Sequence, residues 1–500
     1  MQKIADIPRL YLCLALIAVG FLVYGNTFRN DWTYDDQPVV VQNPDAHSIA
    51  GFLENSRPGR PLRELSYIPE YKLFGANPAG YHVQQIGWHV ANGILLFTIF
   101  CMLGIPPAAS LVGALFFLVH PLQTESVANI SHRKELLALF FSLAAFFAYL
   151  KAVSAREGKR VALLCAALSS YALALLANET AIPLPLLLIS YDVLYLKREE
   201  RIIARRPYLL AVVIALAGGM FVYHFRGLFS ADQALAIYSK NNFLDSRGYL
   251  PLFFAAFKAF GFYLYKIVFP IQLAPEYVIK FSAAVFQPLA WLAIALFLLL
   301  IGLAISLRHK APAVAFGICW FLIFYLPVSN FLPVAYIVAD RYMYLCLPGV
   351  SLVLAWLLHS AQKQAYYGAG AILLVLISLT VIQNTYWRNE HTLWRHAVTV
   401  NPDSTWVQET VALSYLLTDE FPKAEEHAKK AIALFRYNTR AYYTLAKAED
   451  RLGNLDEAIR NYELFKSFGF MEYPEDVAKV KTYLPFLRER AQRLRQSEGK

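Results

Sequence analysis

Two adjacent carboxylates follow the first apolar stretch of the chain, in the segment DWTYDD at residues 31–36. Asp35 and Asp36 stand beside Trp32 and Tyr34, where an apolar run meets a polar loop. A carboxylate at a bilayer surface can accept the proton of an attacking hydroxyl, and partial burial can raise its pKa toward useful values. The alternative is a solvated loop in which an aspartate caps a helix. The pair therefore supplies two candidate general bases.

A second group of candidate residues is cationic and lies in the segment SHRKELLALF at residues 131–140. Arg133 and Lys134 open a long apolar run there. An arginine fork binds phosphate through two hydrogen bonds and lysine acts as a point charge, so the pair predicts an anionic ligand such as a lipid phosphate. Snorkelling at a helix end is the alternative, but it favours the cytoplasmic side. Arg341 in ADRYMY is a further candidate, although Asp340 is a potential ion-pair partner for it.

Other polar residues stand within or beside apolar runs. His82 and His89 share a stripe at helical spacing with Gln85 and Asn92, and such stripes mostly hold helices together by hydrogen bonds. Ionisable residues in membrane segments are functional candidates by default. No nucleotide-phosphate loop, zinc spacing or nucleophile elbow accompanies them, so an enzyme would need a donor that is already energised, such as a lipid-linked phosphosugar. The remaining supporting candidates are His120, Glu125, Glu135 and Glu179.

The composition indicates a membrane protein. Of the 500 residues, 57% are hydrophobic and 16% are charged, whereas soluble domains contain about 25% charged residues. The net charge of +10 could suggest nucleic acid, but much of it lies in short loops that orient a membrane protein, and no nucleic-acid motif is present. We therefore expect no nucleic-acid partner. All five cysteines lie in apolar stretches and predict neither disulfides nor a zinc site.

Apolar runs predict about eleven spans. Residues 249–269 form a twelfth run, but Lys258 and Lys266 would each cost about 2.5–3.5 kcal/mol inside a span, so an interfacial or re-entrant helix is expected. The first run lacks a small-residue cleavage site and predicts an uncleaved span. The eleven runs are residues 10–24, 81–103, 108–119, 136–150, 161–177, 181–196, 208–223, 285–307, 311–326, 342–358 and 366–382.

Basic loops predict the orientation of these spans. Residues 151–160, 197–206 and 308–310 are rich in Lys and Arg and should be cytoplasmic. The candidate residues then meet at the outer face of a membrane domain covering residues 1–385. The outer segments are the large first loop 26–80 and residues 120–135, 178–180 and 339–342.

The tail, from about residue 386, is polar and repetitive. Alanines recur at a spacing of 34 residues, as in Ala412 with Ala446 and Ala424 with Ala458. This period is typical of tetratricopeptide repeats (TPRs), whose small residues let paired helices approach closely. A generic bundle of helical hairpins is the alternative. The expected fold is all-α: a polytopic membrane bundle followed by a TPR solenoid at residues 386–500, outside the cytoplasm.

Several motifs occur together in a fixed order: YDDQPVVVQNP, GRPLRELSYIPEYKLF, HPLQTESVANISHRKELLALFF, NETAIPLPLLL, ADRYMYL and LWRHAVTVNPDS. This set resembles the membrane proteins with C-terminal TPRs that include the eukaryotic transmembrane O-mannosyltransferases and many bacterial relatives. That family belongs to the GT-C glycosyltransferases, which take sugar from polyprenyl-phosphate donors. The resemblance extends over nearly the whole chain.

The resemblance implies that Asp35 and Asp36 form the acidic motif of the first loop, with one of them as the catalytic base. It implies that Arg133 and Arg341 lie near the donor phosphate. Relatives usually have Gly in place of His132 and Lys in place of Asn178. The missing lysine indicates an altered donor or weakened activity.

The expected function is transfer of a sugar from a polyprenyl phosphate in the bilayer to a protein Ser/Thr or a glycan hydroxyl. The expected location is the outer face of a bacterial inner membrane, with the TPR domain in the periplasm recruiting the acceptor. Alternatives are transfer or ligation of a lipid-linked oligosaccharide, a non-catalytic TPR scaffold, and a transporter, although the internal symmetry of transporters is not evident. No cofactor is implied with certainty, and a divalent cation is left open.

Overall fold

The computed structural model describes residues 8–55, 59–202, 207–225, 249–279, 287–331, 336–470 and 472–498. Within these ranges every regular element is a helix, which confirms the predicted all-α class. The chain divides into two compact units. The first comprises Met1–Leu273 and Ile279–Arg388, and the second comprises Ala274–Val278 and Asn389–Lys500.

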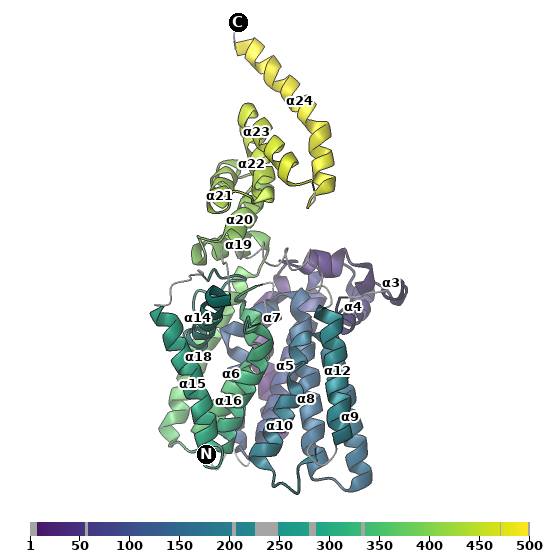
Figure 1. Cartoon of the computed structure of the whole chain (residues 1–500), viewed down its shortest axis with the longest axis vertical. Coiled ribbons are helices and arrows are strands. Elements are labelled where there is room, and N and C mark those ends of the chain that lie inside the picture. Colours follow the sequence, from purple (N-terminus) through teal and green to yellow (C-terminus); the bar gives the residue numbers. More distant parts are fainter. Residues whose placement is uncertain are drawn as a thin grey trace. The chain divides into compact units, whose positions relative to one another are not determined.

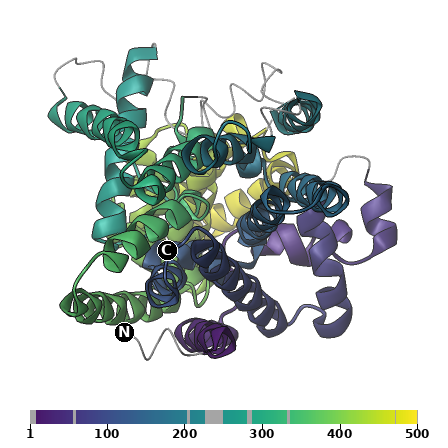
Figure 2. The same cartoon turned by 90° about the horizontal axis from the view of Figure 1, so that it is seen from below.

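The first unit is a bundle of apolar helices that run lengthwise in Figure 1 and are seen end-on, side by side, in Figure 2. Among the described residues, seven helices are long and apolar enough to cross a membrane, or eight if the bent pair α6–α7 counts as one span. The seven contain α2 (Arg9–Tyr24), α5 (Pro78–Met102), α8 (Arg133–Val153), α9 (Glu157–Ala177), α14 (Tyr249–Val268), α15 (Pro288–Leu307) and α18 (Lys363–Tyr386).

Helices form at all eleven predicted runs, but several are shorter than the ~20 residues that a straight crossing needs. The bend of 51° between α6 and α7 falls where Pro121 follows His120. The helices outside the set of seven are α6 (Pro107–Val119), α7 (Thr124–Ala128), α10 (Leu184–Tyr195), α12 (Pro207–Phe225), α16 (Pro312–Tyr325) and α17 (Leu347–His359).

Helix α14 is long enough to span, yet its contacts lie at one end of the bundle (Figure 1). It packs on Trp291 and Phe297 in the first half of α15, and on Tyr325 at the last residue of α16. Its Lys266 ammonium donates hydrogen bonds to two carbonyl groups of the following loop. These contacts cover the first half of α15 and the end of α16, and the interfacial or re-entrant placement of α14 stays a prediction.

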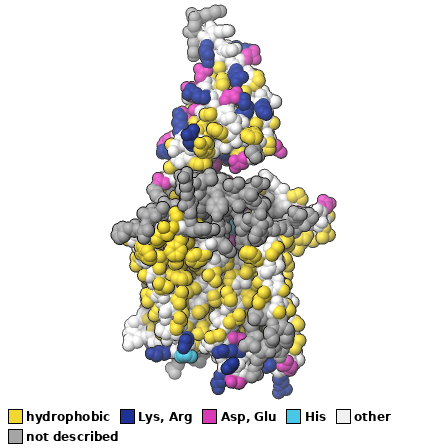
Figure 3. Space-filling model, viewed as in Figure 1, with side chains coloured by type: hydrophobic (Ala, Val, Ile, Leu, Met, Phe, Trp, Pro, Cys, Tyr) yellow, Lys and Arg dark blue, Asp and Glu magenta, His cyan; other side chains and the backbone are white. Residues whose placement is uncertain are grey.

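The two ends of the bundle differ in charge. Figure 3 shows a broad apolar belt with Lys and Arg side chains gathered at one end. At this end α8 gives way to α9 and α15 ends in the basic segment 308–310. The opposite end carries the first loop, with α3 (Ile49–Glu54) and α4 (Pro61–Phe74).

The second unit consists of antiparallel helix pairs. Fully buried alanines, among them Ala412, Ala428, Ala446 and Ala458, stand between the paired helices and let them approach closely. Gly453 ends α22 in the left-handed conformation, with φ of 86°. The predicted helical-repeat architecture is confirmed. Its helices are α19 (Glu390–Val400), α20 (Thr405–Leu417), α21 (Phe421–Leu434), α22 (Thr439–Leu452), α23 (Leu455–Phe468) and α24 (Pro474–Glu498).

The closest approach of α16 and α17 depends on two glycines. A Cβ atom added to Gly317 would lie 2.6 Å from the carbonyl oxygen of Gly349, and one added to Gly349 would meet the carbonyl of Gly317. We expect Gly349→Ala to lower the free energy of unfolding by about 1–3 kcal/mol, because the helices must separate. Thermal unfolding in detergent measures this.

Gly302→Ala in α15 is the matched control, since nothing lies within 4 Å of its added Cβ. Its melting temperature should stay the same or rise slightly, because alanine favours the helix over glycine. Equal melting temperatures for Gly349→Ala and the parent protein would contradict the packing argument.

Candidate functional site

The buried carboxylate of Asp36 joins two loops that lie far apart in the sequence. One of its oxygens accepts the backbone N–H of Thr33 at 3.0 Å, and the other accepts that of Ser131 at 2.6 Å. The side-chain amide of Asn129 donates to the carbonyl of Thr33 at 3.0 Å. Burial raises the pKa of Asp36 to about 7, although the backbone N–H donors act in the opposite direction. Both oxygens are engaged, so Asp36 positions the loop.

Asp35 has the opposite environment. Its side chain is exposed, and within the described parts of the chain its carboxylate makes no hydrogen bond or ion pair. The preceding Tyr34 has φ of 58°, which is uncommon for a non-glycine residue and concentrates at functional sites. The ring of Tyr34 packs against His132 and Trp387, with centroid distances of 5.8 and 6.3 Å. This backbone turn leaves one aspartate buried and the other open to a substrate.

Arg341 lies near this loop and is almost fully buried. Its guanidinium forms an ion pair with Glu125, and the second Glu125 oxygen accepts the Arg341 backbone N–H at 2.8 Å. The rings of Tyr336 and Tyr342 face the guanidinium at 4.9 and 5.3 Å. Arg341 is close enough to Tyr34 to interact with it electrostatically. The carboxylate that pairs with Arg341 is therefore Glu125, where the sequence had suggested Asp340.

Lys134 is the least compensated cation of the site. Its side chain is 15% exposed, and the Glu135 carboxylate lies at the limiting distance of 4.0 Å. Arg60, Arg63 and Arg341 are all within electrostatic range of it. A set of neighbouring cations with one loosely paired member is a suitable environment for an added anion.

Arg60 and Arg63 each form an ion pair with a different glutamate. Arg60 forms a two-point hydrogen bond with Glu179 at 2.8 and 3.1 Å, and its buried Nε finds no partner. Arg63 pairs with the adjacent Glu64 at 2.8 Å. The hydrogen bonds to Glu179 use Nη2 of Arg60 alone, so its Nη1 group can still donate to a ligand, whereas Arg63 is nearly fully enclosed.

Arg133 does not reach the site. Its guanidinium is fully buried, pairs with Glu70 at 2.7 Å and donates to Gln85 at 2.8 Å. The ring of Tyr67 faces it at 4.4 Å. The predicted phosphate contact of Arg133 is therefore not supported, because its donors are engaged inside the bundle. Arg133 fastens α4 to α8, and the adjacent Lys134 faces the cluster.

The histidines of the apolar runs connect helices. His89 binds the Tyr344 hydroxyl at 2.8 Å and the Leu118 carbonyl at 3.0 Å, and His120 binds the Ile267 carbonyl at 3.0 Å. Asn92 donates to Tyr344 and to Leu136. The contacts of His89 and Asn92 agree with the structural interpretation of the stripe. Among the described residues His82, in the same stripe, is buried with no hydrogen-bond partner for either ring nitrogen, and Asp340 is buried as well.

Asn178 donates a hydrogen bond to Glu135 at 2.9 Å and is a neutral contact of the carboxylate that lies nearest to Lys134. Sequence reasoning missed Arg60, Glu70 and Tyr67. The signal for Arg60 was a basic residue in the first loop, on the face where orientation does not require one.

A metal ion finds no ready site among the residues that the structure describes. No group of three or more His, Cys, Asp or Glu side chains there is arranged to hold one. The two oxygens of Asp36, which a cation would need, already accept backbone N–H groups. We therefore derive no catalytic step through a metal.

Comparison with protein-family models gave no match. The chain is 26% identical over 465 residues to human protein O-mannosyl-transferase TMTC4, covering 79% of this chain and 62% of that protein. It is 25% identical to protein O-mannosyl-transferase F38B6.6 of Caenorhabditis elegans, covering 78% and 58%. Mouse protein O-mannosyl-transferase TMTC3 is 23% identical, with coverage of 93% and 55%. The chain thus spans less than two thirds of the length of these curated relatives.

Among solved structures, the chain is similar to ArnT from Cupriavidus metallidurans bound to undecaprenyl phosphate. The TM-score is 0.39 at 11% sequence identity, covering 90% of this chain and 79% of that one.

The Arg133–Glu70 pair predicts a stability defect for single substitutions. We expect Arg133→Ala to lower the free energy of unfolding by about 3–5 kcal/mol, because it leaves the Glu70 carboxylate buried without its partner. Arg133→Leu combined with Glu70→Leu should recover much of this loss, since no unpaired charge remains. Thermal unfolding of both variants measures the effect. A stable Arg133→Ala variant with a raised KM for the donor would instead return Arg133 to the phosphate site.

Proposed function

We propose that this homologue of the TMTC-type protein O-mannosyl-transferases is a membrane glycosyltransferase. It transfers a sugar from a polyprenyl-phosphate donor to a hydroxyl of a protein Ser/Thr or of a glycan. The single observation that carries the proposal is the exposed Asp35 carboxylate, held by buried neighbours near Arg341 and a cation cluster in which Lys134 is loosely paired. The relatives are protein O-mannosyl-transferases, which supports transfer to protein.

Asp35 accepts the proton of the acceptor hydroxyl as the hydroxyl oxygen attacks the anomeric carbon of the sugar. The bond from that carbon to the phosphate oxygen breaks, and the polyprenyl phosphate leaves with the electron pair. A single displacement inverts the anomeric centre. The departing phosphate gains negative charge, which Lys134 and Arg341 stabilise. Asp36 holds the loop and takes no part in the proton transfer.

The site faces away from the cytoplasm in this proposal. On the face shown in Figure 3, the surface Lys and Arg side chains of the bundle gather at the end opposite to the first loop, and such residues favour the cytoplasmic side. Helix α18 ends at the site end, where Asn384 binds the carbonyl of Val23 and the backbone of Asp31 binds that of Arg388. The repeats follow directly and lie on the outer side, in the periplasm of a bacterial inner membrane, where they recruit the acceptor.

The base assignment predicts that Asp35→Asn lowers the transfer rate by about 10²–10⁴-fold, because asparagine cannot take up the proton. The fold should be unaffected, since the side chain is exposed. Glycosylated product at matched membrane abundance measures the effect. Glu54→Gln, an exposed carboxylate of the same loop, is the control.

Asp36→Asn should mainly lower stability, whereas Asp35→Asn should mainly lower the transfer rate. An amide cannot accept both backbone N–H groups, so we expect a lower melting temperature with residual transfer. Full product from the double variant would exclude the catalytic role and favour the scaffold alternative. A whole oligosaccharide in the product would identify the lipid-linked oligosaccharide reaction.

The phosphate assignment predicts that Lys134→Gln raises the KM for the donor about tenfold, while Lys134→Arg keeps most of the affinity. Steady-state kinetics in detergent with a defined polyprenyl-phosphate sugar measure this. Lys151→Gln, near the other end of α8, is the matched control and should leave the KM unchanged. An unaltered KM in Lys134→Gln would remove this lysine from the donor site.

The orientation predicts that a reporter fused after Lys500 is exported. Alkaline phosphatase, which is active only outside the cytoplasm, should show activity in this fusion. A green fluorescent reporter that matures only in the cytoplasm should stay dark. The reverse pattern would show that one more segment, with α14 as the first suspect, crosses the membrane.

A further inference from the structure

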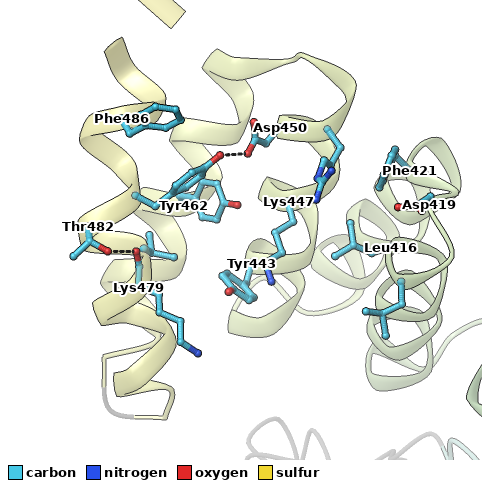
Figure 4. A pocket seen from close by; sticks show the side chains of 14 residues that line it. Leu416, Asp419, Phe421, Tyr443, Lys447, Asp450, Tyr462, Lys479, Thr482 and Phe486 are labelled. Atoms are coloured by element: carbon cyan, nitrogen blue, oxygen red, sulfur yellow. Dashed lines mark hydrogen bonds between the residues drawn. The ribbon is translucent and has the colours of Figure 1, made fainter. Parts of the chain in front are cut away.

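The second unit contains a hollow of about 640 Å³ between α22, α24 and the corner that joins α20 to α21 (Figure 4). A neighbouring hollow of about 350 Å³ shares Tyr443, Lys447 and Lys479 with it. The two therefore form one continuous groove along a single face of α22, from Arg440 to Arg451. Eleven residues of helix rise about 16 Å, which is the length of about five extended residues.

The groove carries two cations without acidic partners. Lys447 and Arg451 are one helical turn apart on α22, and in the described residues neither forms an ion pair. Lys447 lies 4.2 Å from the ring of Tyr443, and Arg451 lies 5.9 Å from that of Phe421. The aromatic rings position these two cations, and their charges remain able to pair with an acidic ligand.

The acids of the groove wall are largely engaged. Asp450 accepts hydrogen bonds from the Tyr483 hydroxyl at 2.6 Å and from Arg490 at 2.9 Å. Asp476 pairs with Lys479 at 3.1 Å. A third acid, Asp419 between α20 and α21, lines the same hollow and forms no ion pair among the described residues. The two cations of α22 outnumber this one unpaired acid, so the excess charge is positive and favours a negatively charged occupant.

Apolar surface lies beside these charges. The side chain of Phe486 on α24 is 59% exposed and that of Leu417 at the end of α20 is 75% exposed, and both line the groove. An aromatic ring on the occupant would cover this surface. The exposed apolar surface, the two cations and the length of the groove together fit an extended peptide better than a small anion.

We propose that this groove binds an extended acidic segment of a protein, about five residues long and containing an aromatic side chain. Its acidic side chains pair with Lys447 and Arg451, and its ring packs on Phe486. Binding itself is independent of sugar transfer; only the use of the groove to present an acceptor protein rests on the proposed function.

Fluorescence anisotropy with the full chain in detergent micelles tests the proposal. The probes are a labelled peptide of sequence Glu-Asp-Phe-Glu-Asp, its Lys-Lys-Phe-Lys-Lys counterpart, its Glu-Asp-Ala-Glu-Asp counterpart, and inorganic polyphosphate. The acidic aromatic peptide should bind at least about tenfold more tightly than the basic one and the alanine one. Equal binding of the alanine peptide or polyphosphate would show a general basic patch and overturn the proposal.

Variants locate the binding. Lys447→Glu with Arg451→Glu should weaken the acidic peptide about tenfold or more, and Phe486→Ala should weaken it by a smaller factor. Lys429→Glu with Lys430→Glu makes the same charge change on α21, outside the groove, and should leave affinity within about twofold. Equal losses in both charge-reversed pairs would overturn the assignment to the groove.

Circular dichroism and thermal unfolding show whether the variants fold. If the charge reversal unfolds the repeats, Phe486→Ala still tests the groove, because its side chain is exposed and its loss should leave the fold intact. Because peptide binding is measured without donor, it can succeed while Asp35→Asn shows full product. Failure of peptide binding and failure of the proposed sugar transfer can therefore be distinguished.

Discussion

One buried carboxylate connects the parts of the candidate site. Asp36 accepts N–H groups from Thr33 in the first loop and from Ser131 at the start of α8, so the first loop is fixed against the helix that carries Lys134. Hydrogen bonds to a charged group contribute about 1.5–3 kcal/mol each, which is enough to hold two short segments in a single arrangement. The exposed Asp35 is thereby held on the same side of the bundle as Lys134.

Charges inside the bundle follow one rule, because an isolated charge away from water is costly. The cations of the site region each have a carboxylate near them: Glu179 for Arg60, Glu64 for Arg63, Glu70 for Arg133, Glu125 for Arg341 and, more loosely, Glu135 for Lys134. The pairs differ in the distance between the two charged groups and in how deeply they are buried. Arg133 and Glu70 are fully buried 2.7 Å apart, whereas Lys134 is partly exposed and lies 4.0 Å from Glu135, which suits the proposed contact with the donor phosphate.

The sequence predicted the helices, the helical repeats and the clustering of polar segments at one end, because apolar runs and a repeat period are properties of long stretches. The sequence could not show which of two adjacent residues faces the site and which is buried. Asp35 and Asp36 differ by one position, and the turn at Tyr34 decides which of them enters the core. Arg133 and Lys134 also differ by one position, and the helical rotation of about 100° per residue decides between them. The partners that fix those orientations, such as Glu70 and Ser131, come from distant segments whose side chains carry no local signal.

The ring of Tyr34 rests on Trp387, and the backbone N–H of Asp31 binds the carbonyl of Arg388 at 2.8 Å. Arg388 is the residue after which the second unit begins. The loop that carries Asp35 is thus seated on the final residues of the membrane bundle, one peptide bond before the second unit. A ligand of the repeats that shifted Arg388 would change the affinity for a ligand at Asp35, and by reciprocity that second ligand would change the affinity of the repeats by the same free energy.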